Sequence, residues 1–357
     1  MVRLRLLATA AAALMAVAAP VLAQDLVAGP RVNMTAVTQP GPTLPQYTRV
    51  DIPMMRDGFA QRSGGRVNVT LQSWPERGVG GPEVIRLVRS GQVEIGGATL
   101  GVVSGDVPML DALDLAGLNP TLDQARRVAD AMTPVLNRDL ERVGVRLLAV
   151  YPFPAQVFFC RRPVAGMASM RGLRVRTNGP SVADFVQAYG AQAAAIAFPE
   201  VYAALERGTV DCAITGTGTA NGVKWWEVTT HMYTLPSTWS LSGYFVNLAW
   251  WNRQTPEVRA FLEDGFKRIA DAQWELGAVA TQDGIDCNLG LADKCRIHTV
   301  VPEARRMIEV VPSAEDLATI QTTFRDVVLP AWVARCGARC GEIYNQVIAP
   351  ISGVRAP

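Results

Sequence analysis

A thirteen-residue pattern occurs twice in this chain, with its copies 117 positions apart. The first copy covers residues 83–95, the second covers residues 200–212, and four positions are identical. In each copy, apolar residues at helical spacing lead to a glycine, Gly91 or Gly208, and an apolar strand follows. Helix–glycine–strand units are also common in unrelated α/β proteins. Two copies in one chain nevertheless predict two α/β lobes, and a cleft between lobes is a frequent site for a small ligand.

The first residues predict an exported protein. Arg3 and Arg5 precede an apolar stretch at 6–19, and Val21-Leu22-Ala23 places small residues where a signal peptidase cleaves. A membrane anchor is the competing interpretation, but the span is short and rich in alanine. We therefore expect residues 1–23 to be a cleaved signal peptide. The mature protein should be periplasmic, with no direct membrane insertion.

Acidic and basic side chains almost balance, giving a formal net charge of +2. Because the sequence has no basic run or stripe, we do not expect nucleic acid as a partner. The mature chain is long enough for two domains with cores of their own.

Six cysteines lie beyond the predicted cleavage site. An even number in an exported chain favours disulfides over a metal site, and the two histidines are not spaced like zinc ligands. Short loops suggest two pairs, and the third requires two adjacent strands in the second lobe. The expected pairs are Cys287–Cys295, Cys336–Cys340 and Cys160–Cys212. The second pair is the least secure, because a regular helix there would point both thiols outward.

Strand-like and helix-like segments alternate along the chain, which predicts mainly parallel sheets. A proline-rich break at 152–154 begins the second lobe, and an apolar strand at 244–249 is expected to return to the first. Residues 255–281 predict one helix, capped by Thr255 and long enough to span both lobes. Lobe 1 would then comprise residues 24–152 and 241–283, and lobe 2 residues 153–240 and 284–357.

Enzyme motifs are scarce in this sequence. His231 and His298 are the only histidines, and neither belongs to a recognisable nucleophile pair. No Gly-x-Ser-x-Gly elbow is present. The glycine-rich segment 216–222 fails the dinucleotide spacing and is better explained as a turn. We therefore expect no catalysis and no cofactor, while a periplasmic enzyme on a two-lobed scaffold remains an alternative.

The most specific signal is the run 170–176 followed by 195–200 and 201–211. Their residues, Met-Arg-Gly-Leu-Arg-Val-Arg, Ala-Ile-Ala-Phe-Pro-Glu and Val-Tyr-Ala-Ala-Leu-Glu-Arg-Gly-Thr-Val-Asp, resemble solute-binding proteins of TRAP (tripartite ATP-independent periplasmic) transporters. The resemblance extends more faintly to 83–95 and 247–251. It implies a periplasmic-binding-protein fold that closes on a small organic acid and delivers it to TRAP membrane subunits. A ligand-binding partner of a membrane sensor is an alternative that the sequence does not separate from transport.

The resemblance also implies which residues bind the acid. The family pairs an arginine of this strand with the ligand carboxylate, and the matching residue is Arg176. A guanidinium suits a carboxylate because two parallel charge-assisted hydrogen bonds fix its plane. Arg174 should point to the opposite face of the strand. Phe198 matches an aromatic ring that packs on the ligand, and Asn178 follows at strand spacing as a possible donor.

The chain departs from the family at two informative positions. Gln156 stands where many members have a second arginine, which argues against a tightly held second carboxylate. Ile214-Thr215 stands where the family often has an Asn or a Glu-Trp pair. The Glu-Trp version accompanies a bridging metal, so we expect no metal. The ligand should therefore be a monocarboxylate or aromatic acid more readily than a compact dicarboxylate.

The remaining candidates depend on position. Trp74 lies in a glycine-rich loop and Trp239 near a family aromatic, and tryptophan offers rigid apolar area with one donor. Thr99 and Thr215 end comparable strands, and strand ends face the crevice in open α/β sheets.

Overall fold

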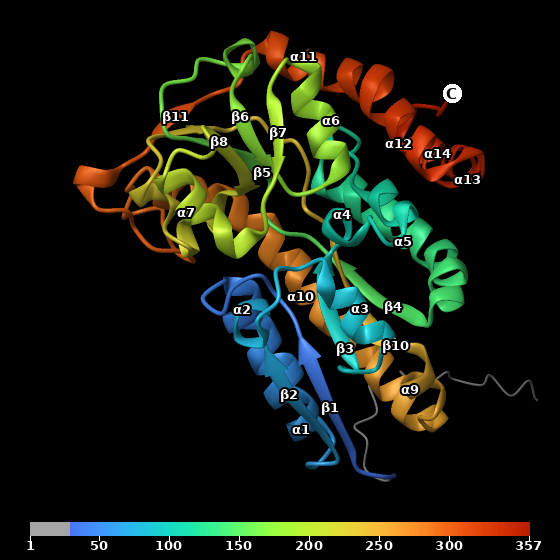
Figure 1. Cartoon of the computed structure of the whole chain (residues 1–357). Helices are drawn as coiled ribbons and strands as arrows, with labels where there is room; N and C mark the ends of the chain where they lie inside the picture. The colour runs from blue at the N-terminus through green and yellow to red at the C-terminus, as the bar shows by residue number, and fades with distance from the viewer. Residues whose placement is uncertain (1–28) are drawn as a thin grey trace, which may run out of the picture.

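The computed structural model describes residues 29–357, so the predicted signal peptide lies outside the described residues. Two separate sheets organise the chain (Figure 1). The first sheet has the strand order β2-β1-β3-β10-β4 and the second has the order β11-β9-β5-β8-β6-β7. The strands of the first sheet are β1 (Val32–Val37), β2 (Val67–Gln72), β3 (Ile95–Thr99), β4 (Val145–Tyr151) and β10 (Ser242–Asn247). Those of the second are β5 (Gln156–Cys160), β6 (Arg174–Thr177), β7 (Gln192–Ala195), β8 (Cys212–Gly216), β9 (His231–Tyr233) and β11 (Ile308–Val310).

The repeated pattern forms the predicted unit once in each sheet. Helix α3 (Glu83–Arg89) leads to β3, and α7 (Val201–Glu206) leads to β8. Gly91 and Gly208 both have φ of +73°, a value that favours glycine. Both helices end with the same pair of backbone hydrogen bonds. One N–H donates to the carbonyl five residues earlier and the other to the carbonyl three residues earlier, which is a Schellman motif. The prediction of two α/β lobes is confirmed.

The sheets are mixed, and the prediction of mainly parallel pairing holds by a narrow margin. One strand in each sheet runs antiparallel to both of its neighbours: β10 between β3 and β4, and β5 between β8 and β9. The other five pairings are parallel. The two antiparallel strands are the ones with which the chain enters one sheet after leaving the other. Strand β10 returns to the first sheet, as the sequence predicts.

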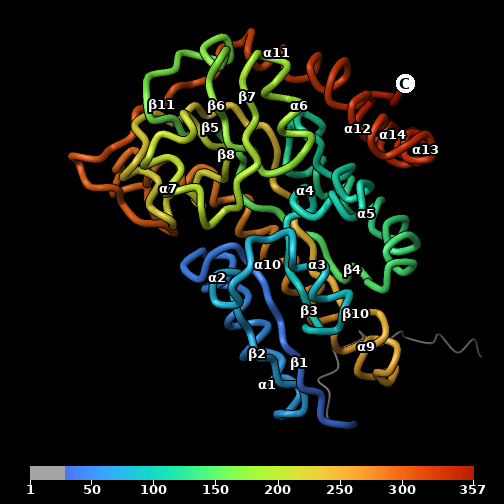
Figure 2. The backbone as a smooth tube through the Cα atoms, viewed as in Figure 1, coloured from blue at the N-terminus to red at the C-terminus, as the bar shows by residue number. Residues whose placement is uncertain are grey.

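Helix α10 (Pro256–Asn288) connects the two halves of the molecule. It begins as predicted, with the Thr255 hydroxyl accepting from the Val258 backbone, but it extends seven residues beyond the expected end. At 33 residues it is about 50 Å long. It packs on β4 at one end and on α8 (Thr217–Gly222) at the other. Figure 2 shows it passing between the two groups of strands.

The glycine-rich segment 216–222 forms α8 and not the predicted turn. Glycines of both helices allow a close contact, since a Cβ on Gly284 of α10 would collide with the backbone nitrogen of Gly218 in α8. Burial of this small-residue face against α10 outweighs the weak helix propensity of glycine.

The C-terminal helices cover one side of the molecule. Helices α13 (Ala338–Val347) and α14 (Ala349–Ser352) pack on α5 (Leu122–Leu140), while α12 (Leu329–Cys336) packs on α6 (Pro180–Ala188). The remaining helices are η1 (Gln46–Asp57), α1 (Gly58–Arg62), α2 (Trp74–Arg77), α4 (Leu100–Val103), α9 (Leu248–Asn252) and α11 (Ala314–Thr323), together with short turns of 3₁₀ and π geometry. None of the helices in residues 29–357 is long and apolar enough to cross a membrane.

The three predicted cysteine pairs are all disulfides in the structure. Cys160 and Cys212 are register partners on adjacent strands β5 and β8, which meets the condition set for that pair. The bond between Cys336 and Cys340 also forms, because Gly337 breaks the helix between them with φ of +97°. The third bond joins Cys287 to Cys295 at the end of α10.

Candidate ligand-binding site

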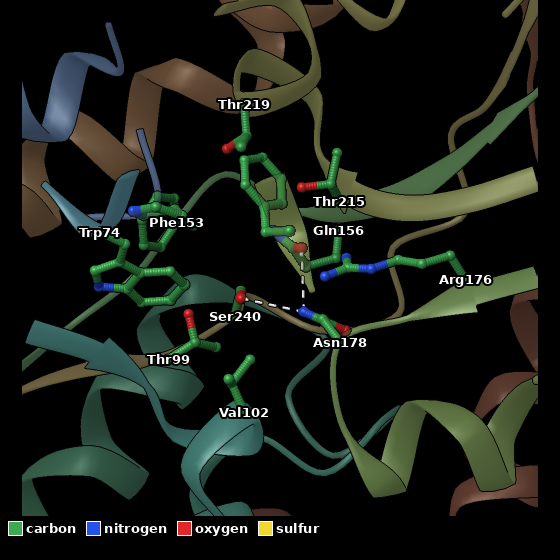
Figure 3. A pocket seen from close by; sticks show the side chains of 12 residues that line it. Trp74, Thr99, Val102, Phe153, Gln156, Arg176, Asn178, Thr215, Thr219 and Ser240 are labelled. Atoms are coloured by element: carbon green, nitrogen blue, oxygen red, sulfur yellow. Dashed lines mark hydrogen bonds between the residues drawn. The ribbon is translucent and has the colours of Figure 1, made fainter. Parts of the chain in front are cut away.

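A small cavity of about 30 Å³ lies between the two halves of the molecule (Figure 3). One wall comes from segments around the first sheet and the other from β5, β6, β8 and the loops that follow them. The residues that line it are Pro40, Trp74, Thr99, Val102, Phe153, Gln156, Arg176, Asn178, Phe198, Thr215, Thr219 and Ser240. Seven of the eight predicted ligand residues are therefore brought together, and Trp239 is not among them.

Arg176 is the one charged residue among those that line this cavity. Its side chain is buried in β6, where Nε donates to the Ile196 carbonyl and Nη1 to the Ile214 carbonyl, each at 3.0 Å. Within residues 29–357 no carboxylate lies within ion-pair distance, and Nη2 makes no hydrogen bond. Burial lowers the pKa of Arg176 to about 10, so the guanidinium is still protonated at neutral pH. The site therefore holds a buried, oriented cation that no carboxylate of the described residues neutralises.

The neighbouring arginine has the opposite environment, as the strand period predicts. Arg174 is exposed, and its Nε lies 3.5 Å from an oxygen of Asp211. It contributes to a surface ion pair and lies outside the cavity.

Amide and hydroxyl groups surround the guanidinium. Asn178 donates from Nδ2 to Oε1 of Gln156 at 3.4 Å and to the hydroxyl of Ser240 at 3.3 Å, which are both long bonds (Figure 3). Two buried oxygens, Oδ1 of Asn178 and Oγ1 of Thr219, have no hydrogen-bond partner among the described residues. A buried polar group without a partner costs free energy. These groups therefore favour a ligand that carries polar substituents.

Aromatic rings form the apolar part of the wall. Trp74 is anchored by its own donor, since Nε1 donates to the Gly97 carbonyl at 2.9 Å, and so only its ring is offered to a ligand. Phe198 stacks on Trp225 with centroids 5.8 Å apart. The guanidinium carbon of Arg176 lies over the Phe198 ring, 5.8 Å from its centroid. Phe198 therefore contacts the cation while it packs against the core.

The two predicted threonines lie at comparable positions. Thr99 ends β3 and accepts from the hydroxyl of Ser242 at 3.2 Å. Thr215 is on β8, and its register partner Val157 is next to Gln156 on β5. Both hydroxyls line the cavity from opposite walls.

Trp239 does not line the cavity but stabilises the segment next to it. Its indole Nε1 donates to the Asn119 carbonyl at 3.0 Å, and its backbone nitrogen donates to the carboxylate of Asp114. The same carboxylate accepts from the Leu241 backbone. These contacts hold Ser240, which has φ of +47°, between the two bonded residues. Ser240 is thus the residue of this segment that reaches the cavity.

Five lining residues were not expected from the sequence. Ser240 follows the candidate Trp239, and Val102 and Phe153 lie within three residues of Thr99 and Gln156. These three could have been included by neighbourhood alone. No sequence pattern indicates Pro40 or Thr219, because their loop and short helix meet the cavity only through tertiary packing.

Burial of Asp114 predicts an unusual pH dependence of stability. Burial raises its pKa from 3.8 to about 7, so the folded protein binds this proton more tightly than the unfolded chain. Its contribution to stability is therefore complete below pH 4 and is lost as the pH rises through 7, by up to about 1.4 kcal/mol per pH unit. An Asp114→Asn variant should have a flatter profile of unfolding free energy between pH 4.5 and 7.5, measured by urea denaturation.

An exposed carboxylate serves as the control for that measurement. Asp130→Asn on the outer face of α5 should keep the wild-type slope. Equal slopes for the wild type and Asp114→Asn would contradict the assignment, whatever the overall stability of the variant.

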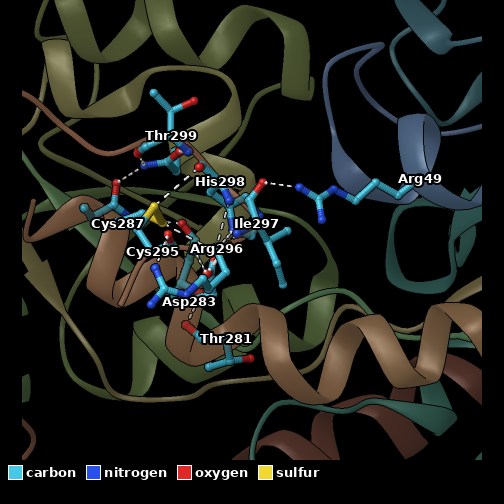
Figure 4. A network of polar contacts seen from close by, with 12 residues as sticks. Arg49, Thr281, Asp283, Cys287, Cys295, Arg296, Ile297, His298 and Thr299 are labelled. Atoms are coloured by element: carbon cyan, nitrogen blue, oxygen red, sulfur yellow. Dashed lines mark hydrogen bonds and ion pairs between the residues drawn. A yellow bond between two sulfur atoms is a disulfide. The ribbon is translucent and has the colours of Figure 1, made fainter. Parts of the chain in front are cut away.

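Neither histidine forms a catalytic pair. His231 is buried in β9 with its Nδ1 2.8 Å from the Thr230 hydroxyl. His298 is also buried, with Nδ1 2.7 Å from Asp283, which further accepts backbone hydrogen bonds from the loop 296–298 (Figure 4). Its Nε2 packs against Gly218 and has no hydrogen-bond partner in the described chain. The pair therefore orders the segment 296–298, which directly follows the Cys287–Cys295 disulfide.

One cluster of metal-ligand types occurs within residues 29–357, formed by Asp283, Cys287 and Cys295. Its two sulfurs are joined in a disulfide, so they cannot act as thiolate ligands. The cluster lies where this disulfide joins the end of α10 to the segment that follows it.

Two α/β lobes lie on either side of a cavity that is lined by a buried arginine and by several polar side chains. This arrangement defines a solute receptor of the periplasmic-binding-protein type. Comparison with known proteins identifies the family of the chain. It belongs to the bacterial extracellular solute-binding proteins of family 7, whose sequence model matches residues 37–308. This is the family of TRAP solute receptors, as the resemblance implied, and its members are binding proteins.

Two curated relatives are distant. The 2,3-diketo-L-gulonate-binding periplasmic protein YiaO of Escherichia coli is 26% identical over 235 residues, which are 64% of this chain and 71% of that protein. The uncharacterized protein y4mM of Sinorhizobium fredii is 27% identical over 191 residues, or 53% of this chain. The aligned region spans only 35% of the length of that second relative.

Solved structures share the fold. A TRAP solute-binding protein of Desulfovibrio salexigens with bound orotic acid has a TM-score of 0.78 at 18% identity, covering 90% of this chain and all of that one. DctP7 of Bordetella pertussis, a receptor binding pyroglutamic acid, has a TM-score of 0.74 at 21% identity, covering 87% and 97%. A protein of Haemophilus influenzae with bound L-gulonate has a TM-score of 0.74 at 16% identity, covering 88% and 98%. These likenesses establish the two-lobed fold.

Proposed function

We propose that this protein is the periplasmic receptor of a TRAP-type transporter, that it binds a small organic monocarboxylate by cleft closure, and that it delivers the acid to membrane subunits. The observation that carries the proposal is the buried guanidinium of Arg176, which has no anion among the described residues. A carboxylate in the cavity would compensate this charge and accept from the free Nη2. No second cation lines the cavity for a second carboxylate.

The ligands of similar proteins agree with this class. The ligands of four structural neighbours are pyroglutamic acid, orotic acid, L-gulonate and β-D-galacturonate. Each carries one carboxyl group beside ring or chain polar groups. The same chemistry in this chain would pair the carboxyl group with Arg176 and the polar groups with Asn178, Gln156 and Ser240.

The other predicted lining residues would contact the ligand according to their positions in the cavity. Trp74 and Phe198 would enclose the ligand from opposite lobes, and Thr99 and Thr215 would donate from the strand ends. Closure would bring together a first lobe of residues 24–152 and 241–283 and a second lobe of residues 153–240 and 284–357.

Isothermal titration against paired acids tests the proposal. At least one of pyroglutamate, orotate and gulonate should bind at least tenfold more tightly than succinate, malate or fumarate, because a buried second carboxylate without a cation is costly. The bound acid should be recovered chemically unchanged by mass spectrometry. Tighter binding of a dicarboxylate would refute the monocarboxylate class, and turnover would favour an enzyme.

A further inference from the structure

A second and larger cavity adjoins the arginine site. Its volume is about 500 Å³, compared with about 30 Å³ for the inner cavity. The two cavities share a wall of five residues: Trp74, Val102, Arg176, Asn178 and Phe198. We refer to the larger one as the outer chamber.

The lining of the outer chamber is mostly apolar, with Arg176 as its one charged residue and Thr177, Asn178 and Gln187 as its uncharged polar side chains. One side comes from the loop that follows α2 and from α4, including Pro82 and Val102. The other side comes from α6 and from β7 with the residues after it. It includes Ala183, Ala193, Ala195 and Ile196. Such a surface recognises alkyl or aryl groups, because it offers contact area and few hydrogen bonds.

Close contacts between the lobes border the chamber at two places. A Cβ on Gly80 would lie 3.1 Å from the Cβ of Ala197, so the loop after α2 abuts the segment before α7. A Cβ on Gly179 would lie 3.3 Å from the backbone of Gly101, where α4 meets the start of α6. The chamber therefore lies between two points at which the lobes touch, next to the buried cation.

From this geometry we propose that the outer chamber holds the apolar tail of the ligand. The ligand would be an elongated monocarboxylate, with its carboxyl group on Arg176 and an alkyl or aryl chain passing between Trp74 and Phe198. The inference rests on the proposed function and narrows its ligand class. The volumes support it: the inner cavity accommodates roughly a carboxylate-sized group, since one water needs about 10–15 Å³ on this scale. The rest of a larger acid needs the outer chamber.

A homologous series of acids tests the tail directly on the unmodified mature protein. Isothermal titration with unbranched monocarboxylates from propanoate to decanoate should show affinity rising roughly fourfold per methylene until the chamber is filled. Burial of each added methylene in an apolar chamber causes the rise. A constant affinity along the series would overturn the inference, and would indicate that the chamber serves as a water-filled entrance.

A variant whose new side chain fills the chamber provides a second test. Ala183→Trp on α6 should reduce affinity for decanoate at least tenfold while leaving butanoate within about twofold, because only the long tail needs the occupied space. Ala188→Trp is the matched control: it is exposed on the same helix, does not line the chamber, and should change neither affinity. Thermal melting should show that both variants are folded.

The outcomes separate this inference from the function on which it rests. If short acids bind and require Arg176 but chain length and Ala183→Trp have no effect, the chamber inference fails and the proposed function stands. If no monocarboxylate of any length or polarity binds, both fail.

Discussion

Replacing Arg176 with alanine should weaken binding of the preferred monocarboxylate by roughly a hundredfold or more. Removing one partner of a buried charge pair typically costs 2–5 kcal/mol, because the remaining charge stays buried without compensation. Arg176→Lys should also bind weakly, since an ammonium cannot keep the bonds to the Ile196 and Ile214 carbonyls and still present a fork to the ligand. Isothermal titration measures both losses.

Two further variants make the test specific. Arg174→Ala, two residues earlier on the same strand, removes an exposed cation and should leave affinity within about twofold. Arg176→Met should abolish binding without lowering the stability of the ligand-free protein, because a buried charge without a partner is itself costly. Wild-type affinity in Arg176→Ala would refute the assigned role, and equal losses in the Arg174 variant would indicate a general effect of charge.

The disulfide Cys160–Cys212 should contribute more to stability than the other two. It closes a separation of 52 residues, for which the chain-entropy relation gives about 4 kcal/mol. Both sulfurs are buried, so the double variant Cys160→Ala/Cys212→Ala also loses packing. Urea denaturation should show this loss. The bond also ties together the strands that carry Gln156 and Thr215, so ligand affinity should fall with it.

The matched comparison is Cys336→Ala/Cys340→Ala. Its separation is four residues, for which the same relation gives about 2 kcal/mol. It joins two helices at the C-terminal edge, away from the cavity, and its loss should leave affinity unchanged. Equal destabilisation by the two double variants would contradict the loop-length explanation.

Local chemistry explains why much of the fold could be predicted. The repeated unit depends on helical spacing and on a glycine at positive φ, and both are properties of a few consecutive residues. The cap of α10 at Thr255 is equally local. Its true end was missed, because residues 282–288 remain helical through packing on α8, far away in the sequence. The glycines of α8 were assigned to a turn for the same reason.

The residues of the candidate site also fall into two groups: those that local sequence patterns predict and those that depend on tertiary packing. Arg176 and Arg174 could be told apart by strand alternation together with the family motif, and the structure gives them opposite environments. Trp239 was named for its size and neighbourhood, but Asp114, 125 residues away, binds its backbone and turns Ser240 to the cavity instead. No local pattern in the sequence connects these two positions.

By itself, the sequence determined the two α/β units, the two cysteine pairs that close short loops, the strand that carries the arginine and the family to which these belong. Each follows from short-range spacing, in which backbone conformation and burial alternate over a few residues. Tertiary structure alone decided that Arg176 lacks an anion within the described chain, that Ser240 replaces Trp239, and that an apolar chamber lies beside the cation. These depend on distances between segments of different lobes, which are set by packing across the whole molecule.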